Sequence, residues 1–272
     1  MKNVLFATTA LVAFAGAAAA EVTVGGYGYA GVLHDGATTY VDHSVRLTFS
    51  ATVETSSGVT FGASTRMNIN NATAPGAFNR GRIDMTAGGL SVALGGTHGA
   101  MKTLARVATF HGFNDGGGLY IGGGTGVDNN ISTHNDSGNN LLVKYDTGAL
   151  SVAASVNVTG AAVYELAAKY TTNGFSVGAG FSDQNAWMLA LGYSMGNVGV
   201  NIGTNDQSDI TVTASYAINS ATSVGFGFDK NSVGNNIGLQ VSHDLGGASL
   251  IGNVGRTETG NSIAGLGVFF SF

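Results

Sequence analysis

Apolar and polar residues alternate along most of the chain. From about residue 21 onward, short segments carry an apolar residue at every second position, and clusters of Gly, Asn, Asp, Ser and Thr separate them. A period of two is typical of β-strands with one apolar and one polar face. The pattern predicts sixteen strands, at about 22–33, 42–54, 58–69, 79–87, 90–97, 139–146, 149–158, 162–171, 174–182, 186–195, 198–204, 209–218, 223–229, 235–243, 248–257 and 262–272.

Neighbouring segments also fit one another as antiparallel hairpins. A hairpin is acceptable only if apolar residues face apolar residues across it, because a slip of one residue inverts both faces. Turns at 55–57, 147–148, 172–173, 196–197 and 245–246 meet this condition. They set Ala51 opposite Phe61, Tyr145 opposite Leu150, Tyr170 opposite Phe175, Tyr193 opposite Val200, and Val241 opposite Leu250.

The connections between the predicted strands are short, with one exception. A strand of about 10 residues is long enough to cross a bilayer at a tilt, and sixteen of them use most of residues 21–272. The exception is residues 98–138, which separate the fifth and sixth strands. The sequence therefore predicts one domain of tightly connected strands with a single long loop.

The composition favours a barrel in lipid over a soluble β-protein. Only 10% of the residues are charged, whereas soluble domains carry about 25%, and the mean hydropathy is +0.20. The polar faces consist mostly of Thr, Ser, Asn and Gly, but a soluble sandwich or jelly roll would need charged residues there. Beyond residue 20 no apolar run is long enough for a membrane-spanning helix. We therefore predict an all-β fold, a closed transmembrane antiparallel β-barrel of sixteen strands.

Both ends of the chain carry signals that fit an exported barrel. Residues 1–20 combine Lys2, an apolar run and three alanines before Glu21, which predicts a cleaved signal peptide and a barrel domain at 21–272. The last strand holds Gly267, Phe270 and Phe272. This ending resembles the outer-membrane-protein assembly signal, which the barrel assembly machinery reads.

Four stretches carry a family resemblance: residues 7–22, which run from the leader into the first predicted strand, the hairpin at 46–64, the start of the long loop at Gly95–Ala100, and Phe272. Taken together, they resemble an alphaproteobacterial general porin of the Rhodobacter type. The resemblance implies a homotrimer in the outer membrane of a Gram-negative bacterium. It also implies that the third outer loop, here 98–138, folds into the lumen as a constriction.

Basic residues cluster on the polar face of the predicted second, third and fourth strands. They are Arg46, Arg66, Arg80 and Arg82. The predicted hairpin makes Arg46 and Arg66 direct cross-strand partners, and like charges in that position are destabilising. The long loop offers acidic partners, namely Asp115, Asp128 and Asp136. A basic wall facing an acidic loop would discriminate between solutes by charge, although Lys102 and Arg106 also lie in the loop. Alternatively, the arginines are solvated residues near the rim and the loop lies outside.

Other chemistries find little support. The chain has no Cys, and its six histidines lack paired metal-ligand spacing, so we predict neither a metal site nor a cofactor. The glycines at 122–126 lack the Lys-Ser/Thr of a phosphate loop, and a net charge of −5 argues against nucleic acid. No Ser-centred motif favours an outer-membrane lipase or acyltransferase, so we predict no enzyme.

These observations predict an outer-membrane porin for passive diffusion of small hydrophilic solutes and ions. Two alternatives stay open: a substrate-specific channel, and a non-conducting structural or surface-interaction barrel. The sign of the ion selectivity, the width of the pore and Ca²⁺ binding by the loop also stay open.

Overall fold

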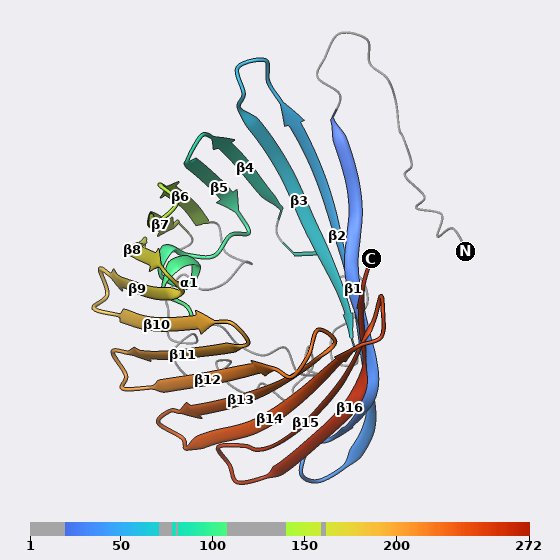
Figure 1. The fold of residues 1–272 in the computed structure, drawn as a ribbon. Helices are drawn as coiled ribbons and strands as arrows, with labels where there is room; N and C mark the ends of the chain where they lie inside the picture. Colours follow the sequence, from blue (N-terminus) through green and yellow to red (C-terminus); the bar gives the residue numbers. More distant parts are fainter. Residues whose placement is uncertain (1–19, 71–77, 80, 108–139, 159–161) are drawn as a thin grey trace.

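All sixteen predicted strands are present in the computed structural model, which describes residues 20–70, 78–79, 81–107, 140–158 and 162–272 (Figure 1). The strands are β1 (Glu21–His34), β2 (Thr39–Glu54), β3 (Thr60–Asn70), β4 (Arg82–Ala87), β5 (Leu90–Gly95), β6 (Asn140–Asp146), β7 (Leu150–Asn157), β8 (Val163–Thr172), β9 (Phe175–Ser182), β10 (Trp187–Met195), β11 (Val198–Asn205), β12 (Ile210–Ala217), β13 (Thr222–Lys230), β14 (Asn235–Asp244), β15 (Ser249–Arg256) and β16 (Ser262–Ser271). Each bound lies within three residues of its predicted position.

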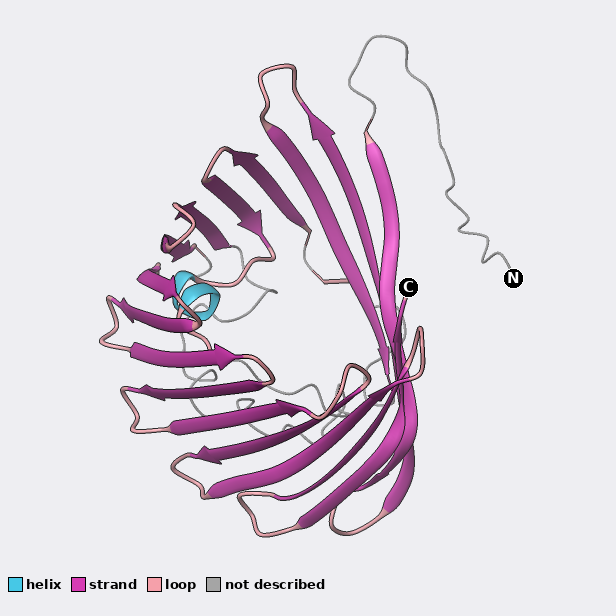
Figure 2. Cartoon of the chain, viewed as in Figure 1, coloured by secondary structure: helices cyan, strands magenta, loops and turns pink. Residues whose placement is uncertain are grey.

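The strands form one closed antiparallel barrel (Figure 2). Each strand pairs with its neighbours in sequence, and β1 pairs with β16 from Tyr27–Ser271 to His34–Ala264 to close the ring. Closure satisfies the backbone groups of both edge strands, which is the condition for a sheet in hydrocarbon. No helix in the described ranges is long and apolar enough to cross a membrane.

The alternation predicted from the sequence separates the two faces of the wall. On β8, Tyr164, Leu166 and Tyr170 are exposed on the outer face, whereas Glu165 and Ala167 are buried on the inner face. The same alternation leaves large apolar side chains exposed on the outer face of the other strands. The outer surface is therefore apolar, and the inner surface carries most of the polar side chains.

Four of the five predicted hairpin registers are wrong by two residues. Ala51 pairs with Ala63, Tyr145 with Val152, Tyr170 with Val177, and Val241 with Gly252, while Tyr193 pairs with Val200 as predicted. The turn positions explain the error. Asn173 and Gly174 both have positive φ, at 47° and 81°, as a two-residue hairpin turn requires, so the turn lies one residue beyond the predicted one. A slip of two preserves the faces, so the predicted faces of these hairpin residues are correct.

The two ends of the barrel differ in their connections. At one end the strands are joined by two to five residues, from 88–89 to 55–59. The other end contains the connection between β5 and β6, residues 96–139. Its first part folds into the barrel, where a short helix that the sequence did not predict, α1 (Ala100–Leu104), packs against β7, β8 and β9 (Figure 1). Residues 108–138 of the predicted constriction loop (98–138) lie outside the described residues.

Candidate pore constriction

Three of the four predicted wall arginines meet in the lumen. Arg46, Arg66 and Arg82 line one cavity of about 400 Å³, together with Tyr27 and His98. The arginines come from the inner faces of β2, β3 and β4, and no two of them are direct cross-strand partners. They therefore form a diagonal row of cations along one side of the lumen.

The predicted direct pairing of Arg46 with Arg66 is wrong. Arg46 lies opposite Asn68, and Arg66 lies opposite Thr48. The turn between β2 and β3 spans 55–59, where Gly58 adopts φ 78° and its amide donates to the carbonyl of Thr55. This longer turn offsets the arginines diagonally, so no like charges lie directly opposite.

Each arginine has a polar or aromatic neighbour on the wall. The Nε of Arg46 donates to Asn68 Oδ1 at 2.7 Å, and its guanidinium lies 4.8 Å from the centre of the Tyr27 ring, within the range of a cation–π interaction. Arg66 donates from Nε to the amide oxygen of Asn79 at 2.7 Å when that amide is oriented to satisfy both groups. These contacts hold the guanidinium groups against the wall.

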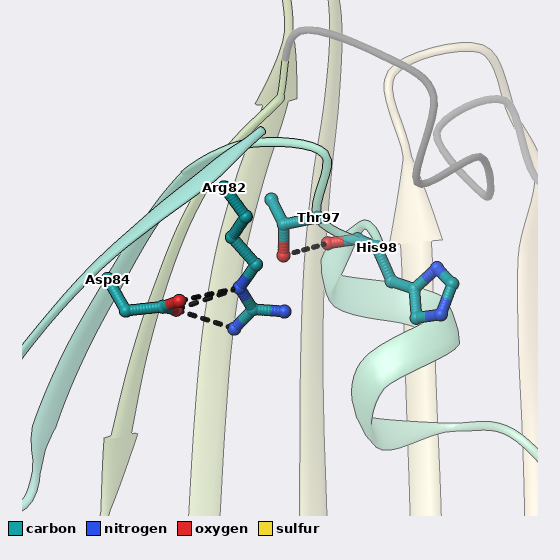
Figure 3. A network of polar contacts seen from close by, with 4 residues as sticks. All are labelled: Arg82, Asp84, Thr97 and His98. Atoms are coloured by element: carbon teal, nitrogen blue, oxygen red, sulfur yellow. Dashed lines mark hydrogen bonds and ion pairs between the residues drawn. The ribbon is translucent and has the colours of Figure 1, made fainter. Parts of the chain in front are cut away.

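Arg82 forms an ion pair with an acid of its own strand (Figure 3). Its Nε donates to Asp84 Oδ1 at 2.8 Å and Oδ2 at 2.9 Å, and its Nη2 donates to Oδ1 at 2.6 Å. Both side chains are partly exposed to the lumen. The wall itself thus supplies an acidic partner for Arg82, whereas the sequence predicted acidic partners in the long loop.

A second lumen cavity, of about 700 Å³, adjoins the first and shares Arg82 and His98 with it. Its basic lining residues also include Lys102 and Arg106 from the start of the long connection and Lys144 from β6, whereas Asp84 is the one acid among its lining residues. Lys144 pairs with Asp146 at 2.5 Å. Among the described residues that line these two cavities, basic side chains therefore outnumber acidic ones, both on the wall and at the start of the connection.

The other predicted site residues are Arg80, Asp115, Asp128 and Asp136. They lie outside the described residues, so their place in the pore stays a prediction. Within the described ranges no group of His, Asp and Glu residues could hold a metal ion.

The predicted assembly residues lie on the strand that closes the barrel. Gly267 pairs with Gly31 of β1, and Phe270 pairs with Gly28. A Cβ atom at residue 28 would lie 2.7 Å from Phe270 Cζ, so the Phe270 ring lies directly over this glycine. The rings of Phe270 and Phe272 are neighbours on the outer face, with centroids 6.1 Å apart.

Residues 7–267 match a family model described as Gram-negative porin. The chain belongs to the Gram-negative porin family. Its fold is similar to solved structures of engineered variants of the Rhodopseudomonas blastica porin. One variant has a TM-score of 0.78 and 20% identity, covering 92% of this chain and 100% of the other. Another has a TM-score of 0.77 and the same identity and coverage. No curated protein matches the chain.

The family and the fold together indicate the function. A closed barrel of sixteen strands in this family is a multi-pass outer-membrane protein that forms a channel for passive diffusion of small hydrophilic solutes and ions. Both identify a channel rather than an enzyme.

The inner-wall surface against which α1 packs was not predicted from the sequence. That surface includes Ala93, Leu142, Ala153 and Ala167, which are buried against Ala100 and Leu104. The signal was available, because these residues are apolar positions on a face that is otherwise polar. Several apolar residues on the inner faces of neighbouring strands predict that another part of the chain packs against this patch of the lumen wall.

Proposed function

We propose that the narrowest passage of this porin lies between the wall arginines and the start of the long connection. The observation that carries the proposal is that Arg46, Arg66 and Arg82 line a single lumen cavity with His98, the residue that leads into α1. Lys102 and Arg106 line the adjoining cavity. Rows of charge are how pores discriminate between solutes, and these cations draw anions to this side of the passage. We also propose that Asp115, Asp128 and Asp136 of the long loop face this passage, where they would attract cations.

Recording from the purified protein in planar bilayers tests the channel. We expect stepwise conductance increments that are linear in salt concentration. A barrel that is folded by its heat-dependent gel mobility but never conducts would favour the structural or surface-interaction alternative. Saturable block of the current by one class of solute would favour the substrate-specific alternative, because passive diffusion through a hydrated pore does not saturate.

We further propose the finer assignments that the family resemblance implies. Residues 1–20 act as a cleaved signal peptide, and the start of β1 at Glu21 supports that boundary. The mature barrel is a homotrimer surrounded by outer-membrane lipid, and the barrel assembly machinery recognises Gly267, Phe270 and Phe272. The resemblance of residues 7–22, 46–64 and 95–100 also supports the alphaproteobacterial, Rhodobacter-type subgroup. N-terminal sequencing of the exported protein and its mass in detergent test the first two assignments.

A further inference from the structure

We infer that Glu165 and Ser155 are positioning residues of the pore. They hold the first turn of the long connection against the lumen wall and thereby fix the width of the passage. The inference rests on the proposed function, because it names residues that keep the proposed constriction in place.

The two side chains belong to the barrel wall, on β7 and β8, and cap the N-terminus of α1. The amide of Ala100 donates to Ser155 Oγ at 2.8 Å, and the amide of Met101 donates to Glu165 Oε2 at 3.0 Å. The first amides of a helix have no partner within the helix, and the residue before it normally supplies one. That residue is Gly99, which makes no side-chain capping bond. The wall therefore supplies the cap that the local sequence lacks.

Both capping side chains are buried, so losing either hydrogen bond would cost more free energy than losing an exposed one. Glu165 is 2% exposed and Ser155 is 6% exposed. The hydroxyl of Ser155 lies 3.3 Å from Glu165 Oε2 and donates to it. A buried carboxylate requires such partners, and hydrogen bonds to a charged acceptor are stronger than neutral ones. Removing the carboxylate leaves the Met101 amide buried without this acceptor.

Small residues of the wall make room for the helix. A Cβ atom at Gly178 would clash with the carbonyl oxygen of Leu104, and one at Gly180 would lie 2.8 Å from Met101 Cγ. Neither glycine has a positive φ, so the backbone does not demand glycine there. The contact with α1 explains both residues. Glycines of β9 and polar side chains of β7 and β8 thus converge on the same short segment.

This segment also presents charge to the pore. Lys102 lies within α1 and Arg106 follows it, and both line the larger lumen cavity. On the opposite side of the helix, Met101 and Ala105 pack on Met188 of the wall. Releasing the anchored side therefore moves two cations of the passage, which links the buried cap to conductance.

The first experiment removes the cap. We expect the double variant Ser155→Ala/Glu165→Ala to show higher single-channel conductance and more open-state noise than the wild type. Glu165→Gln keeps an acceptor oxygen for the Met101 amide, so it should stay close to the wild type. Ser151→Ala is the matched control, because Ser151 lies on the inner face of β7 four residues from Ser155 and bonds Asp146 instead.

The second experiment measures the helix directly. The chain has no Cys, so Leu104→Cys places one thiol under α1, where Leu104 is buried. In that background the cap variant should react with a water-soluble maleimide at least roughly tenfold faster, because it loses the two buried hydrogen bonds from the amides of Ala100 and Met101. Gly178→Ala should have the same effect without touching Glu165. Gly62→Ala is its control, since a Cβ on the inner face of β3 would meet Asp84 Cβ at an ordinary 3.6 Å.

The outcomes separate the two proposals. Wild-type conductance and wild-type labelling in both the cap variant and Gly178→Ala would overturn the inference. Glu165→Gln behaving like the double cap variant would overturn the acceptor role of this side chain. A folded wild-type barrel that never conducts would overturn the proposed function, while the labelling rates would still test the anchor. Heat-dependent gel mobility identifies any variant that fails to fold, and either remaining variant then decides.

Discussion

Arg82 Nη2 lies 2.6 Å from Asp84 Oδ1, and both residues project from the inner face of the same strand. Residues two apart on a strand share a face, so β4 presents a cation and its counterion side by side to the lumen. The pair lies where the two lumen cavities meet, since Arg82 lines both of them. The carboxylate of Asp84, on the same strand, therefore partly offsets the positive charge that Arg82 contributes to the passage.

Replacing the acid of this pair should make the passage more anion-selective. Asp84→Asn leaves Arg82 without its counterion, and the positive potential of this part of the lumen rises. We expect the reversal potential in a KCl gradient to shift towards that of chloride. The stability of the barrel should change by less than about 1 kcal/mol, as for exposed ion pairs in general. An unshifted reversal potential would show that the pair lies off the ion path.

Neutralising the diagonal row should have the opposite effect. In Arg46→Gln/Arg66→Gln, two cations leave the smaller cavity, so we expect the reversal potential to shift towards that of the cation. Arg256→Gln is the matched control, because Arg256 pairs with Ile237 at the outer-facing positions of β14 and β15 and donates to the carbonyl of Gly260. Equal shifts in the double variant and the control would mean that surface charge, rather than the wall row, sets the preference.

The sequence predicted the faces of the strands better than their registers. Alternation alone assigns Arg46 and Arg66 to the lumen, because residues an even number of positions apart on a strand share a face, whatever their cross-strand partners are. Their pairing depends on the turn at 55–59, where the positive φ of Gly58 lengthens the connection by two residues. The period-two pattern does not indicate the conformation of Gly58. The predicted cross-strand partner of each arginine was therefore wrong, while its predicted face was correct.

The anchor of α1 was beyond prediction for a different reason. Five residues are too few for a helical period to register, and Gly99 gives no capping signal. The acceptor of the Met101 amide is 64 residues away in the chain. Only the assembled wall brings Glu165 to the helix, so its role depends on tertiary structure.

Trp187 should report contact with lipid. It is the one Trp of the chain, lies on the outer face at the start of β10, and lines an apolar groove of about 840 Å³ together with Leu166 and Ala168. We expect lipids brominated on the acyl chain to quench its fluorescence, more strongly when the bromine is near the headgroup than when it is at the bilayer centre, since aromatic girdles lie at the interfaces. Efficient quenching by aqueous acrylamide without any bromolipid effect would contradict this placement.

Asp35 should titrate at an unusually low pH. It lies in the connection between β1 and β2, where the amides of Ala37 and Thr38 donate to Oδ1 at 2.9 and 2.8 Å. These backbone hydrogen bonds, led by the one from Thr38, lower the pKa of Asp35 from its ordinary 3.8. The lowered pKa means that the turn gains stability above the ordinary pKa and loses it as the pH falls through the lowered value. Carboxyl NMR shifts of Asp35 measure this directly, and a midpoint at or above the ordinary value would contradict it.

Closure of the barrel should depend on the absence of a side chain at Gly28. Phe270 covers this residue on the outer face, and a Cβ there would lie 2.7 Å from the ring. In Gly28→Val the branched side chain displaces the ring and disturbs the pairing of β1 with β16. We expect slower refolding into lipid vesicles and a lower melting temperature by heat-dependent gel mobility. Gly252→Val is a matched control on the outer face of β15, where a Cβ would meet Leu266 Cδ1 at an ordinary 3.6 Å. If both variants refold at the same rate, the seating of Phe270 on Gly28 does not limit closure.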